Sequence, residues 1–193
     1  ILVCTEGNIM TVVAYPGRTI GSDQITSFQL GPAAGSALAP PSITPDGRVA
    51  FFASLSGGSR EAIALWDGSP DFVAVHNTGG FGADVTPAGG VYAATESAAV
   101  IDASGGLAFL ARIAGGVTSE ALIYQPTTGT GVPIVVGDAA PNSGFFAGNP
   151  FSTPLLNDAG DVVFRAFLAR TDASVGLFRS RGGSLDALVR AGD

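Results

Sequence analysis

Residues 43–55 read ITPDGRVAFFASL, and two later stretches follow the same pattern: residues 101–113 read IDASGGLAFLARI and residues 156–168 read LNDAGDVVFRAFL. A glycine and a phenylalanine four positions later fall in register in the three stretches: Gly47 and Phe51, Gly105 and Phe109, Gly160 and Phe164. The copies recur about every 55 to 58 residues, a period typical of arrays of one supersecondary unit. The sequence therefore predicts three copies of one structural unit.

The phenylalanine of each copy lies in a predicted strand that is apolar on both faces. Alternate side chains of a strand point to opposite faces, so Val49, Phe51 and Ala53 share one face. The opposite face is also largely apolar in every copy: Ala50 and Phe52, Ala108 and Leu110, Val163 and Phe167. Such a strand is typically buried on both faces. We therefore expect each sheet to be packed between neighbouring sheets, as the blade of a β-propeller is.

Each unit extends to four strands. A glycine turn precedes the phenylalanine strand, and a second apolar stretch follows it and ends at an aromatic residue: Trp66, Tyr124 or Phe178. A valine- or leucine-containing stretch closes each unit, at residues 73–75, 134–136 and 187–189. The predicted fold is all-β, a β-propeller or propeller-like array of four-stranded antiparallel blades. Three complete units follow a half unit at the N-terminus, with approximate boundaries 1–17 (half), 18–78, 79–137 and 138–193.

Composition excludes several classes of structure and partner. The 28 glycines and 12 prolines leave no dozen residues with uninterrupted helical periodicity, so we expect negligible helix, and residues 59–67, the best helical candidate, are predicted as a strand. The net charge of -7 leaves no basic patch for nucleic acid. No run reaches the roughly 18 apolar residues of a membrane helix, so we expect no membrane insertion by this segment.

The repeat count bears on closure of the array. Propellers usually need at least about four blades, and the N-terminal half unit supplies only the equivalents of a third and a fourth strand. We therefore expect further residues or a second chain to complete the array. The sequence also predicts self-association through open blade edges, because unpaired edge strands are templates for pairing.

Two short motifs resemble known repeat families. Residues 156–164, LNDAGDVVF, resemble the NxxGxxAF tandem repeat of bacterial surface proteins, with Val163 in place of alanine, and residues 189–193, VRAGD, are similar to the segment that closes such repeats. Residues 44–51, TPDGRVAF, are similar to the blade strand of TolB-type propellers. The resemblance implies a bacterial, exported protein that is extracellular or located at the cell surface. It implies no reaction.

Seven charged residues are the candidate binding residues. In a propeller, the connections between blades and those between second and third strands share one face, and such loops commonly carry function. On this arrangement the face gathers Asp23, Arg60, Glu61, Asp84, Glu120, Asp138 and Asp172. The alternative is that these are solvated loop charges that keep an apolar chain dissolved.

The sequence predicts no metal site. His76 is the only histidine and Cys4 the only cysteine, so a zinc site lacks ligands and a structural role for His76 is favoured. Asn157, Asp158 and Asp161 could supply oxygen ligands to calcium, as could Asp67 and Asp71, but neither group has EF-hand spacing and both sit where turns are expected. Calcium is the one cofactor left open.

Everything periodic in the sequence is core and turn, and no nucleophile elbow, P-loop or dinucleotide fingerprint occurs. We therefore expect a non-catalytic extracellular or cell-surface module that binds a protein or glycan ligand or acts as a structural spacer. The alternative is a propeller enzyme acting on a carbohydrate or ester substrate, with calcium assistance. The two differ in whether carboxylates converge at one site.

Overall fold

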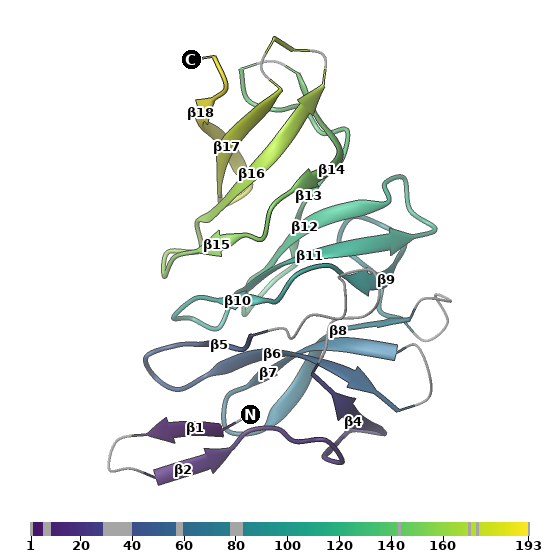
Figure 1. Ribbon diagram of the computed structural model, residues 1–193, viewed down its shortest axis with the longest axis vertical. Coiled ribbons are helices and arrows are strands. Elements are labelled where there is room, and N and C mark those ends of the chain that lie inside the picture. Colours follow the sequence, from purple (N-terminus) through teal and green to yellow (C-terminus); the bar gives the residue numbers. More distant parts are fainter. Residues whose placement is uncertain are drawn as a thin grey trace.

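The computed structural model describes residues 2–5, 9–28, 40–56, 60–77, 83–142, 144–169, 171–172 and 174–192. Within these ranges the chain forms antiparallel sheets and no helix, which confirms the predicted all-β class. The sheets follow one another along the long axis, from β1 (Leu2–Thr5) and β2 (Ile9–Val12), which form a two-stranded hairpin, to the C-terminal sheet (Figure 1). A propeller arrangement of these sheets stays a prediction.

The first large sheet is an antiparallel meander with a broken first strand. Two short strands, β4 and β5, pair with different parts of the phenylalanine strand β6, and β7 and β8 then follow in order. Its strands are β3 (Thr19–Ile20), β4 (Asp23–Ser27), β5 (Ser42–Ile43), β6 (Val49–Leu55), β7 (Arg60–Trp66) and β8 (Pro70–Asn77).

The second and third large sheets have the same plan of a broken first strand followed by three paired strands. The second comprises β9 (Val91–Thr95), β10 (Val100–Ile101), β11 (Leu107–Ala114), β12 (Glu120–Gln125) and β13 (Val132–Val135). The third comprises β14 (Phe145–Phe151), β15 (Leu155–Leu156), β16 (Val162–Ala169), β17 (Val175–Arg181) and β18 (Ser184–Arg190).

One turn geometry precedes each phenylalanine strand. In the third sheet the side chain of Asn157 accepts hydrogen bonds from the backbone N–H groups of Ala159 (3.0 Å) and Asp161 (2.9 Å), and Gly160 has a φ of 75°. Asp102 accepts the corresponding bond from the N–H of Gly106 (2.9 Å), and Thr44 does so from Arg48 (2.9 Å). The polar first residue and the glycine three positions later are therefore the turn itself.

The core lies between sheets as well as within them. Phe51, Phe109 and Phe164 are each buried, as predicted. One cluster joins Phe52 of the first sheet to Phe109 of the second, and the next joins Leu110 of the second to Phe164 of the third. Each phenylalanine strand of the first two sheets is thus buried on both faces, which explains its almost continuous apolar sequence.

The third phenylalanine strand departs from this prediction. Along β16 buried and less buried side chains alternate, with Val163 half-buried and Phe167 exposed. The expectation that this strand is covered on both faces was wrong, because no described part of the chain packs on its outer face.

The three aromatic residues expected at the ends of the third strands also do not occupy matching places. Trp66 ends β7 and Tyr124 is next to the last residue of β12, whereas Phe178 lies in the middle of β17. Trp66 lies opposite Val49, Tyr124 lies opposite Ala108, and Phe178 lies opposite Phe164. These partners stand at different positions relative to the phenylalanine of each unit. The sequence distances from Phe51 to Trp66, from Phe109 to Tyr124 and from Phe164 to Phe178 are similar, but they do not correspond to one strand register.

Candidate functional site

Asp23 and Arg60, two of the predicted binding residues, form an ion pair in the first sheet. Asp23 begins β4 and is buried, and its carboxylate accepts from the guanidinium of Arg60, which begins β7. Glu61 follows on β7, where burial raises the pKa of its carboxyl above the ordinary value. These charges are thus held at the edge of the protein core rather than projected into solvent.

Glu120 belongs to a similar group in the second sheet. It pairs in register with Arg112, and the guanidinium of Arg112 forms an ion pair with Glu96. Burial raises the pKa of Glu120, the charge of Glu96 raises it further, and Arg112 opposes both effects. Arg112 is therefore ion-paired with Glu96, and its charge also acts on Glu120.

Asp84 and Asp138 connect successive sheets. The carboxylate of Asp84 accepts from the backbone N–H of Val75 (2.8 Å), and its carbonyl oxygen accepts from the N–H of Tyr92 (3.0 Å). Asp138 makes the same two bonds, to Val135 (2.9 Å) and Phe146 (3.0 Å). Each aspartate thus joins the last strand of one sheet to the first strand of the next.

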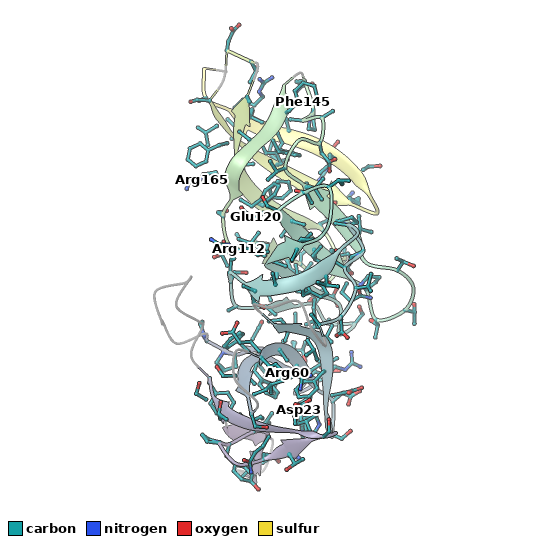
Figure 2. All side chains as sticks on the ribbon, turned by 90° about the vertical axis from the view of Figure 1, so that its right-hand side faces the viewer. Asp23, Arg60, Arg112, Glu120, Phe145 and Arg165 are labelled. Atoms are coloured by element: carbon teal, nitrogen blue, oxygen red, sulfur yellow. The ribbon has the colours of Figure 1, made fainter. Side chains whose placement is uncertain are left out.

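Asp172, the seventh candidate, is exposed between β16 and β17. The structure does not gather the seven candidates at one point. Figure 2 shows Asp23 and Arg60 near one end of the molecule, with Arg112 and Glu120 further along and Arg165 and Phe145 on the last sheet. Asp23 and Arg60 form a local ion pair, and Asp84 and Asp138 make turn contacts between successive sheets.

The oxygen-rich groups considered for calcium have diverging contacts. Asn157 caps its turn, Asp158 accepts from the N–H of Ala103 (3.1 Å) on the second sheet, and Asp161 pairs with Arg181. Among the described residues no group of three or more histidine, cysteine, aspartate or glutamate side chains is placed to hold a metal ion. The side chain of His76 lies outside the described part of the chain.

A pocket that the sequence reasoning missed lies where β6 begins and β7 ends, at the other end of β7 from Arg60. Because Val49 pairs with Trp66, the turn before β6 and the turn after β7 lie side by side. They enclose a pocket of about 310 Å³ lined by Asp46, Gly47, Arg48, Trp66, Asp67 and Gly68. We call this the turn pocket.

The turn pocket combines an aromatic ring with charged groups. Trp66 is half-buried, and Asp67 is exposed. Arg48 forms an ion pair with Asp46 (3.3 Å), and the hydrogen bond from Thr44, followed by the charge of Arg48, lowers the pKa of Asp46. The pocket thus offers an indole, a guanidinium and two carboxylates.

A second pocket of about 310 Å³ lies between the first and second sheets, lined by Leu65, Val73, Gly105, Leu107, Gln125, Pro126 and Thr127. Arg48 of the turn pocket also contacts the second sheet, because its guanidinium donates to the carbonyl oxygen of Ala103 (3.1 Å) and lies close to Gly105, which lines the second pocket.

A comparison with protein families assigns the chain to a family. Residues 22–193 match the Family of unknown function (DUF7453). The chain belongs to this family. No curated protein and no solved structure matches it. For this DUF7453 chain, functional inference therefore rests on the geometry of its own residues.

No described helix of the DUF7453 chain is long and apolar enough to cross a membrane.

One sequence signal could have revealed the turn pocket. The TPDGR turn and the Trp66–Asp67–Gly68 segment flank adjacent strands of one predicted hairpin, so correct pairing of those strands would have placed the turns together. That register was not determined by the sequence spacing.

Proposed function

We propose that this DUF7453 chain is a non-catalytic binding module, built on a propeller-like array of antiparallel sheets, whose turn pocket takes a neutral, hydroxyl-rich glycan. The observation that carries the proposal is the grouping of Trp66 with Arg48, Asp46 and Asp67 around one pocket. An extracellular or cell-surface location is part of the proposal, and it is supported by the resemblance to bacterial surface repeats.

The chemistry of the turn pocket suits a sugar ring. An aromatic side chain offers an apolar surface together with a polar edge, which matches the C–H face and the hydroxyl rim of a pyranose. Carboxylates accept hydrogen bonds from hydroxyl groups and a guanidinium donates to them, so one pocket can serve both roles of a hydroxyl. The volume is at the lower limit of ligand pockets, which suits one or two sugar units.

The balance of charge favours a neutral ligand. Asp46 and Arg48 already neutralise each other in an ion pair, and Asp67 adds one negative charge. A negatively charged glycan would therefore meet repulsion from Asp67, and Arg48 is already shared between Asp46 and the carbonyl oxygen of Ala103.

The arrangement of the other carboxylates supports a non-catalytic module over the enzyme alternative. Asp23 and Asp161 are paired with arginines, and Asp84 and Asp138 are bonded to backbone groups. Glu96 and Glu120 lie around Arg112, an arrangement that suits an ion-pair network. An acid–base pair of the glycosidase type needs two carboxyl groups that face a bound substrate. In the turn pocket, Asp46 is held by Thr44 and Arg48, which lower its pKa, so it is not suited to act as a general acid.

Trp66 makes the proposal easy to test, because it is the only tryptophan of the chain. Its fluorescence should change on titration with cellohexaose, xylohexaose, maltohexaose or chitohexaose, and isothermal titration calorimetry would measure the affinity for the oligosaccharide that responds. We expect Asp67→Asn to weaken that affinity by about tenfold, which corresponds to roughly 1.4 kcal/mol.

Asp71→Asn is the matched control. Asp71 lies four residues away on β8, its carboxylate accepts from the backbone N–H of Phe72, and it does not line the turn pocket. Unchanged fluorescence with all four oligosaccharides would overturn the proposal. So would binding that Asp67→Asn and Arg48→Gln leave intact.

A further inference from the structure

The second pocket, between the first and second sheets, repeats the plan of the turn pocket. The turn pocket lies between the glycine turn before β6 and the turn after β7. Gly105, in the corresponding turn before β11, lines the second pocket, as do the end of β12 and the residues that follow it: Gln125, Pro126 and Thr127. Each pocket is therefore built where a phenylalanine strand begins and the strand paired with it ends.

The two pockets follow one another along one edge of the stack. The turns before β6, β11 and β16 lie one above another along the left side of Figure 1. In β7, Trp66 packs against the core on the N-terminal side of the first sheet, and Leu65 packs against the core shared with the second sheet. Arg48 lines the turn pocket, and its Nη1 lies 3.2 Å from where a Cβ would stand at Gly105. A ligand that leaves the turn pocket along Arg48 therefore reaches the second pocket.

The lining of the second pocket suits a neutral sugar unit. Apolar side chains from both sheets form its walls: Leu65, Val73, Leu107 and Pro126. The Gln125 amide makes long hydrogen bonds within the chain, at 3.3 Å to the carbonyl oxygen of Pro126 and 3.4 Å to that of Gly129, so a sugar hydroxyl can replace them. The Thr127 hydroxyl donates to the carbonyl oxygen of Ser104 (3.0 Å) and keeps lone pairs that accept from a ligand. The described residues that line this pocket are all uncharged, which continues the preference of the turn pocket for a neutral ligand.

From this repetition we propose that the second pocket is a further sugar subsite, and that the chain takes a linear neutral glycan laid across the edges of its first two sheets. The inference rests on the proposed function, because the turn pocket is the first subsite. Stacked sheets lie about 10 Å apart, so successive units of one oligosaccharide reach both pockets. Occupying both raises the affinity, since the second contact is intramolecular once the first has formed.

The test compares short and long members of each oligosaccharide series by isothermal titration calorimetry. Cellobiose, xylobiose, maltose and chitobiose are titrated beside the corresponding hexaoses. In the series that binds, we expect the hexaose to bind the wild-type chain at least about tenfold more tightly than the disaccharide. Thr127→Phe, which places a ring at the exposed rim of the second pocket, should remove that difference and leave the affinity for the disaccharide unchanged. Gln125→Ala, which adds no bulk, should weaken the hexaose alone.

Thr128→Phe is the matched control, because Thr128 is the next residue, is exposed and does not line the second pocket. It should keep the full difference between hexaose and disaccharide, and circular dichroism melting shows whether each variant has kept its fold. Equal affinities of the wild-type chain for the two lengths would overturn the second subsite and leave the turn pocket as a single site, as would a difference that survives both Thr127→Phe and Gln125→Ala. An absence of binding by every sugar would instead overturn the proposed function, and this inference with it.

Discussion

The guanidinium of Arg181 donates two hydrogen bonds to the carboxylate of Asp161, at 2.7 Å to Oδ1 and 2.5 Å to Oδ2. Asp161 is the last residue of the turn before β16, and Arg181 is the last residue of the neighbouring strand, β17. The Asp161 side chain is 5% exposed, whereas that of Arg181 is 60% exposed. The pair thus fixes an almost buried carboxylate with a cation that reaches solvent.

This pair predicts a loss of stability in acid. The hydrogen bond from Arg181, supported by that from Asn157, lowers the pKa of Asp161 from 3.8 to about 2. A depressed pKa in the folded state means stabilisation that is complete above the unfolded value of 3.8 and disappears as the pH falls through about 2. Asp161→Asn should therefore be less stable than the wild-type chain near neutral pH, and the difference should narrow between about pH 4 and pH 2 in urea unfolding.

Asp186→Asn is the control for the Asp161 experiment. Asp186 pairs with Arg179 on the same sheet, but its side chain is half exposed, and exposed ion pairs contribute little. A loss of equal size and equal pH dependence in both variants would contradict the role given to the Asp161–Arg181 pair.

The parts of the fold that were predictable from sequence are those set by local chemistry. Asn157 and Gly160 bracket a turn that few residue types can form, and Phe164 follows at a fixed distance because the strand begins there. The almost continuous apolar sequence of β6 and β11 predicted their burial on both faces in the same way. These signals depend only on neighbours in the chain.

The rest depended on how strands and sheets meet. The register of β7 on β6 places Trp66 opposite Val49, and hence beside the turn that contains Asp46 and Arg48, but no short-range pattern fixes that register. The exposure of Phe167 was missed for a similar reason. Its own strand looks like β6 and β11, and the difference lies in what covers it.

The three buried phenylalanines should each be essential to stability. Phe51→Ala, Phe109→Ala and Phe164→Ala should each lower the free energy of unfolding by about 3–5 kcal/mol, because each leaves a cavity in a core shared between strands. Phe164 should lose most, since its ring contacts those of Phe146, Phe151 and Phe178 at centroid distances of 5.7–5.8 Å. Urea unfolding measures the losses, with Val117→Ala expected to change stability by less than about 0.5 kcal/mol.

Two adjacent glycines should respond differently to the same substitution. Gly89 and Gly90 both have positive φ angles, so alanine at either position is strained by about 1–2 kcal/mol. A Cβ at Gly89 would meet nothing, whereas one at Gly90 would lie 2.5 Å from the carbonyl oxygen of Ala114 and 2.6 Å from the nitrogen of Gly116. Gly90→Ala should therefore lower the free energy of unfolding by about 1–3 kcal/mol more than Gly89→Ala does, measured by thermal or urea unfolding. Equal effects would mean that the turn before β9 does not pack against the β11–β12 loop.

Glu120 should reduce stability at neutral pH, because its folded environment opposes its charge. Burial and the neighbouring Glu96 raise the pKa of Glu120 above its ordinary 4.5, in spite of Arg112. A raised pKa for an acid means that the ionised folded form is disfavoured, so the destabilisation is complete above the folded pKa and absent below 4.5. Glu120→Gln should therefore raise the urea midpoint at pH 7 and leave it almost unchanged near pH 4.

Arg112→Gln should lower the urea midpoint at pH 7, because the charges of Glu96 and Glu120 would then repel each other without the guanidinium of Arg112. If Glu120→Gln lowered the midpoint at pH 7, attraction to Arg112 would outweigh burial, and the sign of the shift assigned to Glu120 would be wrong.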